Sequence, residues 1–77
     1  MNVHDIMIHE CTAYHKRMSK AGWDLNLALL FQAVDRVEGM VAGGADIIAA
    51  VSETFNDSLR TRINKAILKH ESMKGNE

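Results

Sequence analysis

Apolar residues recur at helical spacing along nearly the whole chain, and no proline interrupts them. Residues three and four positions apart share one face of an α-helix, because the helix turns by about 100° per residue. Because this period continues from segment to segment, we expect an all-α fold. The first segment follows the rule at every step, through Val3, Met7, Cys11, Tyr14, Met18 and Ala21.

Glycines and short polar residues mark where the helices end and begin. We expect helices at about residues 3–20, 24–42 and 46–71. Glycine follows the first two, and it favours helix ends because it adopts positive φ without a steric penalty. The expected N-caps, whose side chains accept a bond from a free backbone N–H, are Asn2, Asp24 and Asp46. We expect one helical domain, 1–77, whose last few residues, about 73–77, are frayed.

Residues 54–58 leave two alternatives for the third segment. They have poor helix propensity, and Asn56 or Asp57 can cap a new helix after a break. The apolar stripe from Ile48 to Met73 nevertheless keeps its phase across them, which favours one helix with at most a kink. We therefore predict two or three helices that form a small bundle.

The length of this third helix bears on the oligomeric state. A helix over residues 46–71 is about 39 Å long, whereas a compact chain of this size has a radius of gyration of only about 11.5 Å. The overhanging part would leave apolar side chains in water. The second helix also has an apolar arc of about 200°, wider than a surface helix needs. We therefore expect a homo-oligomer that completes the bundle. The expected interface residues are Phe31, Val34, Phe55, Leu59, Ile63 and Ala66.

One cysteine and four histidines are the residues that most invite a chemical role. Cys11 and His15 are four positions apart, a spacing that lets both reach one metal ion. Structural zinc takes four ligands, however, and no second pair completes the set. Cys11 is expected in mid-helix, where its neighbours shield it, and small helices leave little room for a ligand pocket. We expect no catalytic residue, no metal and no cofactor, and so no enzyme.

The apolar runs and the cysteine count also bear on location. No apolar run exceeds five residues, the length of the run from Leu27 to Phe31, whereas a membrane span needs about 20. The chain opens without the basic and then apolar pattern of a secretory signal. A single cysteine suits a reducing compartment. We expect a cytoplasmic protein without a membrane partner.

The charges are unevenly distributed, although the formal net charge is only −1. Residues 24–57 carry six acidic side chains against one arginine, whereas residues 60–74 carry five basic side chains against one glutamate. Alternatively, the protein is a small DNA-binding regulator whose basic segment contacts the phosphates of DNA. Its contact residues are Arg60, Arg62, Lys65 and Lys69. Nucleic acid is the less favoured partner, because no aromatic residues are interleaved with these charges.

The overall arrangement resembles that of a class of small regulators. A hydrophobic middle, Leu25 to Val41, is followed by a long charged segment, Asp46 to Lys74. In this the chain is similar to small all-helical regulatory proteins of temperate phages and other mobile elements, among them antirepressors. The resemblance is one of architecture, and it transfers no functional residue. It implies an oligomer that binds and sequesters a partner protein such as a repressor.

A candidate partner-binding surface lies where the first two helices join. Interfaces between proteins present apolar anchors with polar rims, and tryptophan and tyrosine are common anchors. The candidate residues here are Tyr14, Met18 and Trp23. The alternative is that Trp23 covers the small core, because large aromatic residues usually pack within their own domain. We predict a protein–protein interaction module that acts as a regulator.

Overall fold

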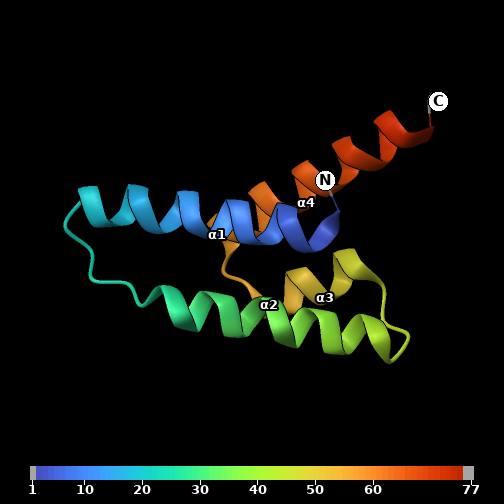
Figure 1. Cartoon of the computed structure of the whole chain (residues 1–77), viewed down its shortest axis with the longest axis horizontal. Coiled ribbons are helices and arrows are strands. Elements are labelled where there is room, and N and C mark those ends of the chain that lie inside the picture. The colour runs from blue at the N-terminus through green and yellow to red at the C-terminus, as the bar shows by residue number, and fades with distance from the viewer. Residues whose placement is uncertain (1, 76–77) are drawn as a thin grey trace.

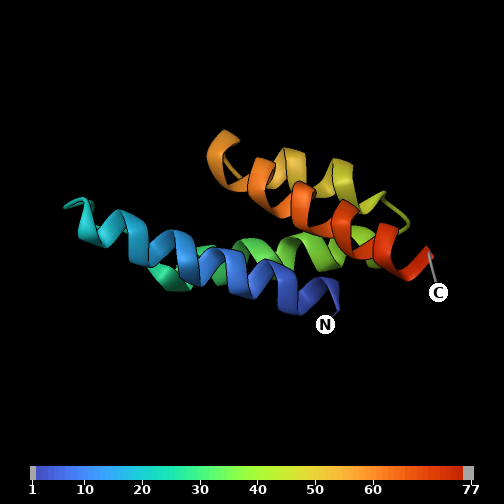
Figure 2. The ribbon, with the colours of Figure 1, turned by 90° about the horizontal axis from the view of Figure 1, so that it is seen from above.

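Four helices make up the computed structural model, which describes the backbone of residues 2–75 and the side chains of residues 2–72 (Figure 1). The helices are α1 (Val3–Lys20), α2 (Leu27–Ala42), α3 (Ile47–Thr54) and α4 (Asp57–Gly75). Each helix contacts the next along the chain, and α4 returns to contact α1. Figure 2 shows α3 and α4 together on one side of the α1–α2 pair. The protein is all-α, since the described residues contain no strand.

The expected glycine-terminated helix ends are confirmed. Gly22 follows α1 with a φ of +90°, and Gly44 follows α2 with a φ of +105°. In both turns the next residue bonds back into the helix. The N–H of Trp23 donates to the carbonyl of Met18 over 2.9 Å, and that of Ala45 donates to Met40 over 3.0 Å. Such turns need positive φ at one residue, and glycine adopts it most cheaply.

Two of the expected N-caps are confirmed, and one is wrong. Asn2 accepts a bond from the N–H of Asp5 over 2.9 Å, and Asp46 accepts one from Ala49 over 3.1 Å. The second helix begins at Leu27 and not near residue 24, because Asn26 is its cap. The Asn26 side chain directly precedes the apolar run of α2 and accepts a bond from the N–H of Ala28 over 2.9 Å.

The prediction of one helix over residues 46–71 is wrong, and with it the prediction of two or three helices. The chain breaks at Phe55, whose backbone is extended with φ −100° and ψ 157°. Asn56 then caps α4 by accepting a bond from the N–H of Leu59 over 3.0 Å. The break brings both halves of the apolar stripe against one core, which is why the stripe keeps its phase. The backbone of α4 continues to Gly75, and the expected fraying at 73–77 concerns residues that lie wholly or partly outside the described range.

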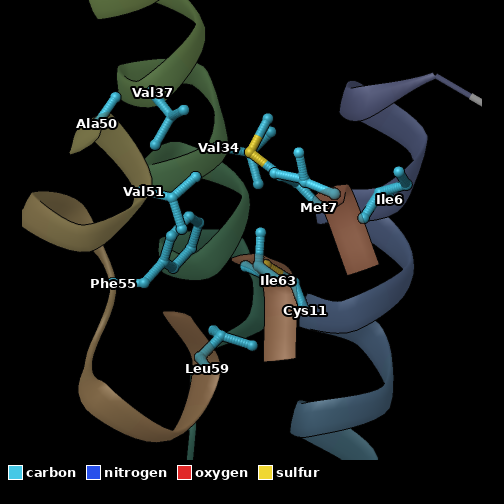
Figure 3. Close-up of a cluster of buried hydrophobic side chains, with 11 residues drawn as sticks. Ile6, Met7, Cys11, Val34, Val37, Ala50, Val51, Phe55, Leu59 and Ile63 are labelled. Atoms are coloured by element: carbon cyan, nitrogen blue, oxygen red, sulfur yellow. The ribbon is translucent and has the colours of Figure 1, made fainter. Parts of the chain in front are cut away.

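The core draws on every helix and on the joint between α3 and α4. Figure 3 shows these side chains converging from α1, α2, α3 and the start of α4. Its members are Ile6, Met7, Cys11, Val34, Val37, Ala50, Val51, Phe55, Leu59, Ile63 and Ile67. Among the described residues no polar or charged residue is buried. The hairpin of α3 and α4 therefore buries within one chain the stripe that a single long helix would leave in water.

Candidate functional site

The residues expected at an oligomer interface are largely used inside the chain. Val34, Leu59 and Ile63 are fully buried, and Phe55 is 6% exposed. Phe31 and Ala66 are half-buried and pack against the core. The surface that motivated the expected interface is therefore mostly absent from the folded chain.

Two of the three expected partner-binding residues line one open hollow, here named the tyrosine hollow. Tyr14 and Met18 of α1 contribute its apolar surface. Its volume is about 570 Å³, and its other lining residues are Arg17, Asp57, Ser58, Thr61 and Arg62. The hydroxyl of Tyr14 accepts a bond from Asn56 over 3.3 Å, which ties α1 to the cap of α4. The Arg17 guanidinium lies 5.8 Å from the centre of the tyrosine ring.

Trp23, the third of these residues, stands outside the hollow and does not cover the core. Its side chain is 63% exposed, the largest exposed fraction among the large hydrophobic residues of the described part. Gly22 turns the chain away from α1 just before it. The joint itself is held by His15, whose Nε2 lies 2.9 Å from the carbonyl oxygen of Leu25. An exposed indole on an anchored joint is available to a partner.

Three of the four expected phosphate-contacting residues share a second hollow, the basic hollow. Arg62, Lys65 and Lys69 line it with Glu10, Thr61 and Ala66, and its volume is about 430 Å³. Glu10 partly neutralises it, because its carboxylate lies 3.6 Å from Nε of Arg62. Arg60 is held differently. It donates to the carbonyl of Ser52 over 3.3 Å and pairs with Asp57 at 2.6 Å.

A third hollow, the end hollow, was not expected from the sequence. It lies where α1 begins, α2 ends and α3 begins, and its volume is about 530 Å³. Its lining is mainly apolar and consists of Asn2, Val3, His4, Met7, Glu38, Val41, Ala42 and Ile47. His4 and Glu38 form a hydrogen-bonded ion pair across it. No sequence pattern could predict this hollow, because its lining residues come from three helices.

Cys11 is buried, and the cysteine and histidines form no metal-binding cluster among the described residues. Cys11 has no exposed surface, and burial raises the pKa of its thiol to about 11. The thiol is therefore protonated at neutral pH and is a poor nucleophile. Among residues 2–72 no three side chains of His, Cys, Asp or Glu come together where they could hold a metal ion. None of the helices, over their described length, is long and apolar enough to cross a membrane.

Comparison with protein-family models, with curated proteins and with solved structures finds no match for this chain. What the structure defines is a small all-α protein with several surface hollows and one exposed tryptophan. Its function has to be inferred from these residues.

The pair of His4 and Glu38 makes stability depend on pH. The pKa of His4 is raised above its ordinary 6.5, first by its hydrogen bond to Glu38 and then by the charge of that carboxylate. Asp5 and Asp35 raise it further. The folded protein thus holds this proton more tightly than the unfolded chain. The resulting stabilisation is complete below pH 6.5 and is lost as the pH rises through the raised pKa.

We therefore expect Glu38→Gln to destabilise the protein more at about pH 5.5 than at about pH 8.5. Urea unfolding of the wild type and of the variant measures the free energy of unfolding at each pH. The salt concentration is kept low, because His4 and Glu38 are partly exposed and salt screens exposed charges. Glu53→Gln, at an exposed carboxylate of α3, is the control and should show no such pH dependence. A loss from Glu38→Gln that is equal at both pH values, or larger at the higher one, contradicts the expectation.

Proposed function

We propose that this protein is a protein–protein interaction module, a cytoplasmic regulator that binds and sequesters a partner protein, and that it is not a catalyst. The observation that carries the proposal is the 63% exposure of Trp23, the only tryptophan of the chain. Burying such a side chain against a partner is strongly favourable, and tryptophan is enriched among residues that dominate binding energy.

The neighbouring tyrosine hollow supports this use. Its apolar part is bordered by charged and hydroxyl groups, as at interfaces between proteins. Arg17 and Arg62 face one carboxylate, Asp57, so the rim is cationic on balance. The partner that fits is a protein segment with an apolar anchor and acidic flanks. The resemblance to antirepressors suggests the role of this binding: the protein binds a regulator, such as a repressor, and keeps it from its target. A homo-oligomer remains part of the proposal, but because most of the residues expected at its interface are buried in the core, its contact lies elsewhere on the surface.

The test is capture from native lysate on immobilised protein. We expect a saturable, stoichiometric partner whose capture falls about tenfold or more with Trp23→Ala. The control is Leu29→Ala, which truncates an apolar side chain of similar exposure, 58%, on α2. The captured protein, once identified, should lose its own ligand or DNA binding when this protein is added at equal concentration. Capture that Trp23→Ala leaves unchanged rejects the proposed site, and a partner that keeps its activity rejects sequestration.

The basic hollow favours a second candidate, a DNA-binding regulator. Its three cations lie together on α4, but Arg62 is paired with Glu10 and Arg60 is occupied elsewhere. We expect no shifted DNA at moderate salt in a mobility assay, because affinity from so few phosphate contacts falls steeply with salt. A complex abolished by joint Arg62→Ala and Lys65→Ala substitution would favour this second candidate instead.

A further inference from the structure

The exposed side chain of Trp23, here called the knob, and the end hollow lie at opposite ends of the molecule. Trp23 lies in the joint after α1, and the end hollow includes the first turns of the same helix. Figure 1 shows that joint at one end of the longest axis, while the start of α1 and the turn between α2 and α3 lie toward the other. An α-helix of 18 residues is about 27 Å long. Trp23 therefore cannot reach the end hollow of its own chain.

The end hollow suits a flat apolar side chain. Val3, Met7, Val41 and Ile47 contribute its apolar surface, and Val41 remains 38% exposed. Its volume of about 530 Å³ leaves room for one indole. Covering Val41 and Trp23 together would remove two of the exposed large hydrophobic residues of the described chain from water.

The charges of the two ends are complementary. At the hollow, Glu38 pairs with His4, and the carboxylates of Asp5 and Asp35 act on the same histidine. Asp46 precedes Ile47, and Arg36 is the one arginine or lysine of α2, so this end is acidic on balance. At the other end, the exposed cations Lys16, Arg17 and Lys20 lie in the last turns of α1, with Asp24 as the one acid beside Trp23. Opposite charges at two exposed rims steer encounter and set its orientation.

We propose that Trp23 of one copy docks into the end hollow of a second copy, so that the chain associates with itself head to tail. This contact differs from the interface expected from the sequence, whose residues are mostly buried. It does not rest on the proposed function. The two uses of Trp23 are mutually exclusive, so self-association would compete with capture of a partner.

The single tryptophan reports the contact directly. Between about 1 µM and 500 µM protein, a range that covers weak self-association, we expect the emission of Trp23 to shift to the blue and the sedimentation mass to rise above 8.6 kDa. Both changes should weaken as salt screens the rims. Val41→Lys should abolish them. Leu29→Lys, at an exposed leucine of α2 outside the hollow, should not.

Complementation distinguishes this contact from any other. Trp23→Ala lacks the knob and Val41→Lys lacks the hollow, so each alone should remain an 8.6 kDa monomer. Mixed in equal amounts, they should form a one-to-one dimer, because one partner keeps the knob and the other keeps the hollow. Circular dichroism checks that both variants are folded. A wild type that stays monomeric with unchanged emission overturns the proposal. So does a wild type that associates while the mixture does not.

The same variants keep the two proposals apart. Val41→Lys leaves Trp23 free, so it should still capture the proposed partner although it no longer self-associates. Capture lost with Trp23→Ala but kept with Val41→Lys supports the proposed function whatever the outcome for self-association. Blue-shifted emission without any captured partner supports head-to-tail association alone.

Discussion

Leu59→Ala is expected to lower the free energy of unfolding by about 3 kcal/mol. Leu59 has no exposed surface and lies in the first turns of α4, where Figure 3 shows it within the converging core. Truncation removes its transfer free energy and leaves a cavity that the surrounding helices can close only in part. Chemical denaturation followed by circular dichroism measures the loss. In so small a domain this is a large share of the total stability.

Leu68→Ala on the same helix is the matched control, because Leu68 is 57% exposed. It removes the same atoms from the surface, so we expect a loss of about 0.5 kcal/mol or less. The protein concentration adds a second comparison. If Leu59 belongs to the core of one chain, the loss does not depend on concentration, whereas at an oligomer interface it would. Equal losses at both leucines contradict the buried position of Leu59.

The features that sequence reasoning predicted correctly are those decided within a few residues. The all-α fold follows from the apolar period. Asn2 and Asp46 are N-caps because a short polar side chain reaches an N–H three positions on. Gly22 and Gly44 end helices because of their positive φ. The start of α2 was misplaced for the same local reason, since Asp24 and Asn26 are both competent caps and the apolar run lies closer to Asn26.

The break between α3 and α4 could not be predicted from periodicity. A stripe that keeps its phase is expected both of one straight helix and of two helices that bury the same stripe against one core. The choice depends on contacts with α1 and α2, which are distant in sequence. Poor helix propensity at residues 54–58 was the local signal. The α3–α4 hairpin is more stable than one straight helix because it buries Phe55, Leu59 and Ile63 within one chain.

In the candidate site, too, some features are decided by neighbouring residues and others by contacts between distant parts of the sequence. Tyr14 and Met18 were placed near a joint, and they do share a hollow, but four of its seven lining residues come from α4. The exposure of Trp23 depends on how the joint packs, and the sequence left that open. The end hollow needed three helix ends in their final places. Individual side chains could therefore be chosen from the sequence, whereas the surfaces they share required the fold.

Two hydrogen bonds connect α4 to Ser52 of α3. The side chain of Asn64 donates to the hydroxyl of Ser52 over 3.1 Å, and Arg60 donates to the carbonyl of the same serine over 3.3 Å. The bond between the neutral side chains of Asn64 and Ser52 contributes about 1 kcal/mol, less than a buried phenylalanine ring. The two bonds position α3 against α4, but the apolar side chain at the joint supplies the larger share of the stability.

Phe55→Ala is therefore expected to lower the free energy of unfolding by about 3 to 4 kcal/mol. Phe55 is 6% exposed in the extended joint, and its ring covers the core that α3 and α4 share. Urea unfolding measures the loss, and Asn56→Ala is the comparison. That change removes only the cap of α4 and should cost about 1 kcal/mol. A smaller loss from Phe55→Ala than from Asn56→Ala would mean that capping, and not burial of the ring, stabilises the hairpin.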